Sequence, residues 1–284
     1  MASCIFLGGA VHPRYVGYGE QERQIRMATS VKNDIGEMFK FAAGHSQVVV
    51  NRQGSFSCLN LRQVYRHDMK VKSILLNEDI SNELHRQVSS TVTGVGGAQK
   101  PLFDSATLKP YTSKYSVRHE IRSFLQNDLS NNLIIFMTGH GGQRMGKDGK
   151  VVESFLLPQQ GSAITENYTD ADLTQDIVNA LPSHKKLYIV MHCCHSGGMV
   201  NFWQLDTNKQ VALFASAEAD LLAEWSSEGD TNFVGTFCSK AGLRAGKRLN
   251  AIADEIYQTL HRVPTIRPVF KTTRPSMAEE SFLS

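Results

Sequence analysis

The sequence predicts an α/β fold in which a mostly parallel sheet of about six strands is flanked by helices. Two apolar runs, Leu133–Met137 and Leu187–Met191, have the length and composition of buried strands. Segments with apolar residues at helical spacing alternate with these and similar runs. A chain of 284 residues with 41% hydrophobic and 20% charged residues suits one large folded domain.

The expected strands are short apolar runs that end at turn residues. In chain order they are Cys4–Gly9, Lys70–Asn77, Leu133–Thr138, Lys186–Met191, Gln210–Ala215 and Val269–Lys271. Strands that alternate with helices favour parallel pairing through right-handed crossovers.

The expected helices carry their apolar residues on one face. They are Ala28–Phe41, Ile80–Val88, Tyr115–Leu129, Thr169–Ala180 and Arg248–His261. The fourth of these begins with Thr169-x-x-Asp172, which resembles a capping box.

Two stretches interrupt this alternation. Residues 46–69 include the short run Val48–Val50, and we expect an insertion or a hairpin at the sheet edge. Residues 89–113 contain a glycine-rich segment and are expected to form a long loop. We therefore predict a single domain over residues 1–284, with 46–69 and 89–113 as insertions or loops.

Composition narrows the class of protein. A net charge of +3 with scattered basic residues does not favour nucleic-acid binding. Five cysteines, two of them adjacent, suit free thiols in a reducing compartment better than a disulfide framework. The N-terminus lacks the basic region of a signal peptide, and no apolar run is long enough to span a membrane. We therefore expect no membrane partner and a protein that is cytoplasmic or delivered into a host cytosol.

Two short motifs follow the two strongest strands. Thr138-Gly139-His140-Gly141-Gly142 comes directly after the first, and His192-Cys193-Cys194-His195-Ser196-Gly197-Gly198 comes at the end of the second. Parallel strands end at one edge of the sheet, which is where open α/β sheets bind their ligands. An imidazole and a thiol are thus expected at the same edge.

Such a pair suits nucleophilic catalysis. A tight turn or a helix start at Cys194 would stabilise its thiolate, and His140 would exchange the proton. Glycine after His140 lets the backbone approach a substrate closely. The backbone N–H groups of Gly141 and Cys194 would then face a developing oxyanion.

Each residue also has a simpler interpretation. A histidine beside glycines is commonly a polar turn residue, and cysteine is commonly buried. Zinc binding is a further alternative for residues 192–195, but four adjacent residues cannot easily surround one tetrahedral ion, and the chain has no Cys-x-x-Cys. We therefore predict no metal site.

The two motifs resemble those of the caspase-like cysteine peptidase superfamily, which includes caspases, metacaspases, legumains and the glycosylphosphatidylinositol transamidase subunit. Leu133–Gly142 is similar to its apolar strand ending in Ser/Thr-Gly-His-Gly, and residues 192–198 resemble the metacaspase box Asp-x-Cys-His-Ser-Gly. Asn33-Asp34 resembles a pair in the first helix of that family. The resemblance implies a caspase-like three-layer sandwich, with His140 and Cys194 rather than Cys193 as a catalytic dyad.

The chain departs from the family at His192. Metacaspases carry Asp there and legumains Glu, and this residue helps to line the pocket for the side chain preceding the cut. An imidazole would suit an acidic or amide side chain better than Arg or Lys. The alternative is that His192 packs in the core and that Ser216 or the following loop sets specificity. We name both His192 and Ser216 as candidate substrate-binding residues.

The predicted function is that of a cysteine endopeptidase acting on protein or peptide substrates through a thioacyl-enzyme. A transpeptidase or transamidase of the same fold and a non-catalytic scaffold remain the alternatives. We predict no cofactor. Neither a Ca²⁺ requirement nor the oligomeric state can be read from these residues.

Overall fold

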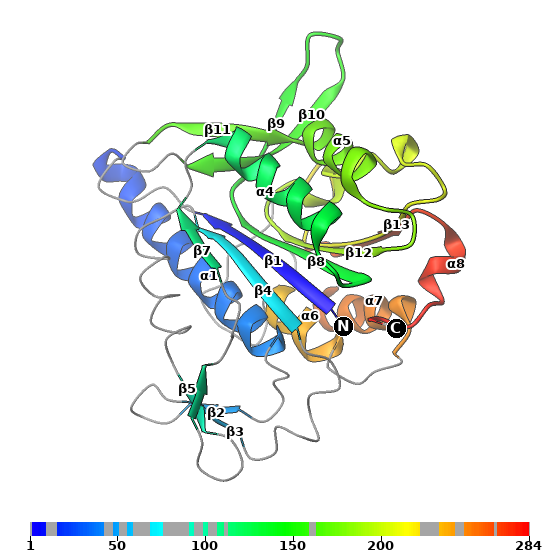
Figure 1. Ribbon diagram of the computed structural model, residues 1–284. Coiled ribbons are helices and arrows are strands. Elements are labelled where there is room, and N and C mark those ends of the chain that lie inside the picture. The colour runs from blue at the N-terminus through cyan, green and yellow to red at the C-terminus, as the bar shows by residue number, and fades with distance from the viewer. Residues whose placement is uncertain are drawn as a thin grey trace.

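The computed structural model describes residues 2–9, 16–42, 48–50, 56–58, 69–75, 91–93, 99–101, 107–110, 113–158, 163–221, 233–241, 247–263 and 266–283. Within these residues the main sheet has seven strands in the order β14-β13-β12-β8-β1-β4-β7 (Figure 1). Their bounds are β1 Ala2–Gly9, β4 Met69–Leu75, β7 Thr107–Pro110, β8 Asn132–Gly139, β12 Lys186–His192, β13 Gln210–Ala215 and β14 Val269–Thr272.

All neighbouring strands of this sheet are parallel except β13 and β14, which are antiparallel. The predicted mostly parallel sheet is therefore confirmed, and every predicted strand is present. The sequence missed β7, because its four residues lie at the sheet edge and are too few to show a pattern.

Helices cover both faces of the sheet, as a three-layer sandwich requires (Figure 1). One face packs against α1 (Tyr18–Ala42), α6 (Phe233–Ala241) and α7 (Leu249–Leu260), and the other against α4 (Lys114–Asn127) and α5 (Asp170–Ala180). Side chains of β1 alternate between the two cores: Cys4 and Phe6 face α1, whereas Ile5 and Leu7 face α4.

Helix α1 begins ten residues before the predicted start at Ala28. Its first turns are mostly exposed and charged, so they lack the apolar spacing on which the prediction relied. The predicted helices over Tyr115–Leu129, Thr169–Ala180 and Arg248–His261 are confirmed as α4, α5 and α7. The helix expected over Ile80–Val88 lies outside the described residues.

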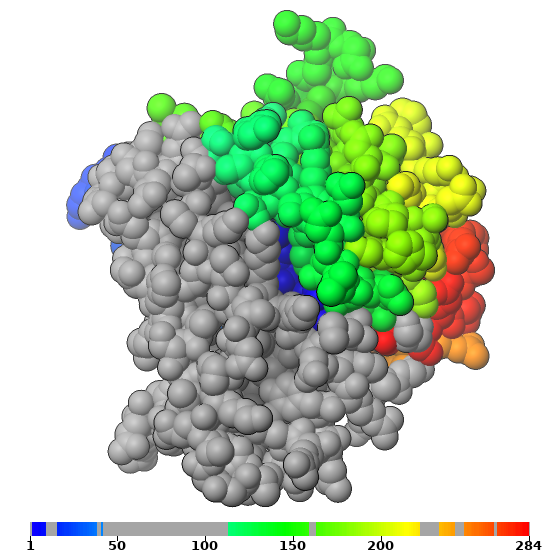
Figure 2. Space-filling view, in the orientation of Figure 1, coloured from blue at the N-terminus to red at the C-terminus, as the bar shows by residue number. Residues whose placement is uncertain are grey.

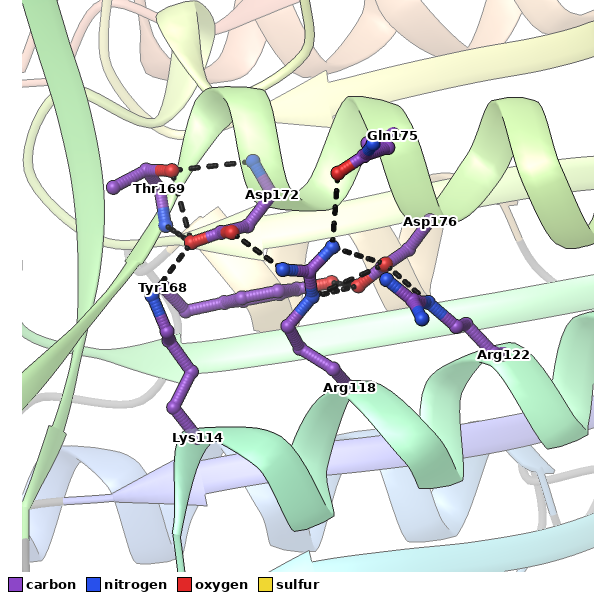
Figure 3. Close-up of polar contacts among 8 residues, drawn as sticks. All are labelled: Lys114, Arg118, Arg122, Tyr168, Thr169, Asp172, Gln175 and Asp176. Carbon is purple, nitrogen blue, oxygen red and sulfur yellow. Dashed lines mark hydrogen bonds and ion pairs between the residues drawn. The ribbon is translucent and has the colours of Figure 1, made fainter.

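An ion network joins α4 to α5 (Figure 3). The Asp176 side chain is fully buried and accepts hydrogen bonds from Arg118, at 2.7 Å, and from the Tyr168 hydroxyl, at 3.0 Å. Arg118 also donates to Asp172, which closes the predicted capping box with Thr169. This network fixes the two helices that cover one side of the sheet.

Two smaller sheets complete the described structure. Strands β9 (Gly141–Met145), β10 (Val151–Pro158) and β11 (Thr165–Thr169) form one, and the β9–β10 hairpin projects from the body of the molecule (Figures 1 and 2). The other consists of β2 (Val48–Val50), β3 (Phe56–Cys58), β5 (Thr91–Thr93) and β6 (Gln99–Pro101).

The two predicted insertions thus contribute to a common sheet. A hairpin is present within 46–69 as β2 and β3, but it belongs to this separate sheet and not, as expected, to the edge of the main sheet. The prediction of a long loop over 89–113 was wrong, because β5, β6 and β7 lie in this segment. Each of these strands has only three or four residues. The remainder of both segments lies outside the described residues. Among the helices that the structure describes, none is long and apolar enough to cross a membrane.

Candidate active site

The two sequence motifs meet at one edge of the main sheet. Strands β8 and β12 are parallel neighbours, and their last paired residues are Thr138 and His192. His140 lies two residues beyond the first of these and Cys194 two residues beyond the second. The strand register therefore places His140 and Cys194 at the same edge of the sheet, as expected from the sequence.

The backbones of the two motifs touch. A Cβ at Gly141 would overlap the carbonyl oxygen of Cys194 and would lie 2.7 Å from its carbonyl carbon and 2.9 Å from its nitrogen. Because ordinary contact begins at 3.4 Å, only glycine fits at position 141. The glycine that follows His140 thus lets the turn after β8 rest directly on the cysteine backbone.

Cys194 opens a tight turn rather than a long helix. His195 has left-handed backbone angles of φ 58° and ψ 18°, and a single 3-10 turn, η2 (Ser196–Gly198), follows it. The loop after β13 holds this turn: Leu221 accepts from the His195 backbone at 2.9 Å, and Ala217 accepts from Gly197 at 2.8 Å. Of the two arrangements expected at the cysteine, a helix start or a tight turn, the structure shows the tight turn.

The His195 side chain belongs to the same restraint. Its Nδ1 donates to the carbonyl oxygen of Ala219 at 2.8 Å, because a carbonyl can only accept. Gln143 of β9 donates its Nε2 proton to the same carbonyl at 3.0 Å. Imidazole and amide together tie the cysteine turn, the hairpin and the loop after β13 to one point.

The two adjacent cysteines have different surroundings. Cys193 is completely buried and packs with Met191 in the core on the α4 side. Burial, and secondarily the Cys194 thiol, raises the pKa of the Cys193 thiol well above its ordinary value. Cys194 retains 9% exposure and packs with Ala217 instead. The geometry therefore favours Cys194 over Cys193 as the accessible thiol.

His140 is half-buried at the start of β9. Burial lowers its pKa to about 4, and the cation of Arg23 on α1 contributes to the shift. The imidazole is consequently neutral at pH 7. A neutral imidazole can accept a proton from a thiol, which is what a general base must do.

The structure places His192 inside the core. Its side chain is 1% exposed, its Nδ1 donates to Oδ2 of Asp34 at 2.7 Å, and its ring lies 6.1 Å from that of Phe233. Of the two alternatives for His192, the packed position is the one observed. The prediction that it lines a substrate pocket receives no support from the described residues.

Ser216 is also buried, with no exposed surface. Its hydroxyl donates to the carbonyl oxygen of Cys193, and it lies 3.4 Å from the Ser196 hydroxyl. Both contacts hold the cysteine turn in place. Ser216 therefore holds the cysteine turn from its buried side, and its role in substrate binding stays a prediction.

A buried carboxyl group that the sequence did not indicate, that of Glu153 on β10, lies beside the cysteine turn. Glu153 is 7% exposed, and a Cβ at Gly198 would lie 2.7 Å from its carboxyl carbon. Burial raises the pKa of this carboxyl. No signal marked it in the sequence, because Glu153, Ser154 and Phe155 are all buried and the alternation of a half-buried strand is lost.

In the part of the chain that the structure describes, no three His, Cys, Asp or Glu side chains converge as metal ligands would. His192 and Cys193 face opposite cores, which separates two of the four residues considered for zinc.

Comparison with known proteins finds a family model that matches the part of the chain with both motifs. Residues 99–203, a segment that contains both His140 and Cys194, match the family model described as metacaspase, peptidase C14 domain. The search of curated proteins found no match.

Solved structures with similarity to this chain include the following two. A protein from Geobacter sulfurreducens is 14% identical with a TM-score of 0.57, and the match covers 98% of this chain and 97% of that one. Caspase-1 from Spodoptera frugiperda is 11% identical with a TM-score of 0.42, over 60% of this chain and 71% of that one. The first of these shows a shared fold over nearly the whole chain. The segment with both motifs is similar to a metacaspase peptidase domain, in agreement with the resemblance that the two motifs themselves show.

Proposed function

We propose that this chain is a cysteine endopeptidase in which Cys194 is the nucleophile and His140 the general acid and base. The observation that carries the proposal is the backbone contact between Gly141 and Cys194, which brings the two turns together at neighbouring strand ends. At the level of the family, the metacaspase match indicates a cysteine peptidase. The Cys-His mechanism below is our inference for this chain.

The reaction begins with transfer of the Cys194 proton to the neutral imidazole of His140. The thiolate attacks the carbonyl carbon of the scissile peptide bond, and the carbonyl oxygen becomes an oxyanion. When this intermediate collapses, the C–N bond breaks and the imidazolium gives its proton to the leaving amine. Water, deprotonated by the imidazole, then hydrolyses the thioacyl-enzyme and restores the thiol.

Backbone N–H groups of Gly141 and Cys194 are the proposed donors to the oxyanion. Their proximity supports this role, because a Cβ at Gly141 would lie only 2.9 Å from the Cys194 nitrogen. Removing one such donor typically costs about 3 kcal/mol of transition-state stabilisation.

Specificity must come from residues other than the His192 side chain, which is engaged with Asp34 in the core. The proposed substrates are proteins or peptides. We propose no metal or cofactor in the chemical step, since thiol and imidazole supply both the nucleophile and the proton transfers.

The test is hydrolysis of a peptide library whose cleavage products are identified by mass. We expect Cys194→Ala and His140→Ala to lower kcat/KM by at least about 1,000-fold, as in other activated-nucleophile enzymes. Cys193→Ala should retain most of the activity, because its thiol is buried in the core on the α4 side. Activity in Cys194→Ala together with loss in Cys193→Ala would show that the wrong cysteine is assigned.

A further inference from the structure

One buried carboxylate on α1 contacts both strands that lead to the candidate site. Oδ2 of Asp34 accepts a hydrogen bond from the Thr138 hydroxyl at 2.6 Å and another from Nδ1 of His192 at 2.7 Å. Asp34 has no exposed surface, and neither does Thr138. A single oxygen atom therefore joins β8 to β12.

The two hydrogen bonds to Asp34 lie at the ends of β8 and β12, directly before the turns that carry His140 and Cys194. Thr138 and His192 are paired across β8 and β12. His140 follows two residues after Thr138, and Cys194 two residues after His192. Any change in the separation of the two strand ends is thus passed directly to the imidazole and the thiol.

The close approach of α1 depends on the neighbouring strand. Gly8 of β1 pairs with Thr138 on the side opposite to His192. A Cβ at Gly8 would lie 2.6 Å from Cδ1 of Ile35, the residue that follows Asp34. Glycine at this position lets the helix lie close enough for a short carboxylate side chain to reach both strands.

We propose that Asp34 is a positioning residue, which fixes the relative placement of His140 and Cys194 by holding the ends of β8 and β12 together. The inference rests on the proposed function, because it assigns Asp34 a role in the geometry of that dyad. Bonds to an ionised group are shorter and stronger than neutral ones, so the carboxylate suits this role better than an amide. Asp34 touches neither substrate nor reacting atoms and acts only through the two strands.

The sheet offers a matched control at its opposite end. Ser3, at the start of β1, forms a buried hydrogen bond of 2.7 Å with the Ser130 hydroxyl just before β8. Ser3→Ala removes one buried side-chain hydrogen bond, as Thr138→Val does, but far from both turns. A loss of stability alone would affect the two variants alike.

The test uses Thr138→Val, which keeps the side-chain shape and removes one of the two donors to Asp34. Thr138→Ser keeps the donor and serves as the conservative rescue. Asp34→Asn keeps the shape but removes the charge, and it is included only if it folds. Each variant is assayed on the peptide library at a temperature where circular dichroism shows it fully folded.

We expect Thr138→Val to lower kcat by about tenfold with little change in KM, because a fraction of an ångström of misplacement weakens the chemical step more than binding. Thr138→Ser should restore kcat to within about twofold, and Ser3→Ala should leave it unchanged because distant sites act independently. Equal kcat values for Thr138→Val and Ser3→Ala would overturn the proposal.

A second readout separates this inference from the proposed function. The rate at which iodoacetamide alkylates Cys194, followed by peptide mass mapping across pH, reports on the thiol–imidazole pair without any turnover. If the wild type cleaves no peptide, the peptidase proposal fails, and the alkylation rates alone decide the positioning role. Slower alkylation in Thr138→Val and His140→Ala, but not in Ser3→Ala, supports it. Wild-type rates in Thr138→Val refute it.

Discussion

Two adjacent glycines after His140 give a sharp test of how the site is assembled. Gly141 and Gly142 are neighbours in β9, and neither lies in the left-handed region that favours glycine. Their surroundings differ. A Cβ at Gly141 would overlap the Cys194 backbone, whereas a Cβ at Gly142 would lie 3.3 Å from Cδ2 of Leu156, at the end of a flexible side chain.

The size of the effect follows from these distances. At Gly141 the new carbon would lie 2.7 Å from the Cys194 carbonyl carbon, about 0.7 Å inside the 3.4 Å at which ordinary contact begins, and it would overlap the oxygen as well. One of the two turns must therefore move by about an ångström. Displacements of this size cost about 100-fold in rate, or ~2.7 kcal/mol of activation free energy. At Gly142, Leu156 needs to move by only a few tenths of an ångström.

The assay compares kcat/KM of Gly141→Ala and Gly142→Ala on one peptide substrate, with thermal unfolding measured alongside. We expect a loss of about 100-fold for Gly141→Ala and less than about fivefold for Gly142→Ala. Nearly equal activities in the two folded variants would show that the contact between the two turns does not set the catalytic geometry.

Three further predictions concern charge. Burial and the charge of Arg23 hold the pKa of His140 at about 4. Arg23→Gln should therefore shift the acidic limb of the pH profile of kcat/KM to higher pH, but not as far as 6.5, because burial is the larger cause. An unmoved limb would show that Arg23 does not contribute to the lowered pKa. Between about pH 6.5 and 4, His140 binds a proton in the unfolded chain but not in the folded one. The free energy of unfolding should therefore fall as the pH drops through that window. Asp176→Ala removes the buried acceptor of Arg118, Arg122 and the Tyr168 hydroxyl, while Arg118 keeps Asp172, and should cost about 1–3 kcal/mol in chemical denaturation. The exposed Asp206→Ala is its control, and equal losses in both would contradict the structural role of the network.

The sequence predicted the central strands, whose side chains are buried on both sides, and the helices that have one clear apolar face. Strands β8 and β12 lie at the centre of the sheet and read as unbroken apolar runs, so their bounds agree within one residue. The first turns of α1 are exposed to solvent, and the edge strand β7 has only four residues, so neither shows a periodic apolar pattern. Helix α6 was also missed, because nearly all of its first five residues are buried and the polar face is short.

The site was predictable where it depends on strand order and unpredictable where it depends on the opposite layer. Period-two alternation along β12 puts Met191 and Cys193 in one core and His192 in the other. That pattern alone separates Cys193 from the surface. Which helix covers His192, and with which side chain, depends on how α1 packs across the sheet, and no local pattern in the sequence encodes that.

The unusual residue of the cysteine motif has a buried partner on α1. Asp34 presents a buried carboxylate to position 192. His192 donates a hydrogen bond to Asp34, and the same oxygen accepts one from Thr138. Residue 192 is thus matched to α1. His192 is also the last residue of β12, so its hydrogen bond to Asp34 links the strand that precedes Cys194 to Thr138 of β8, the strand that precedes His140.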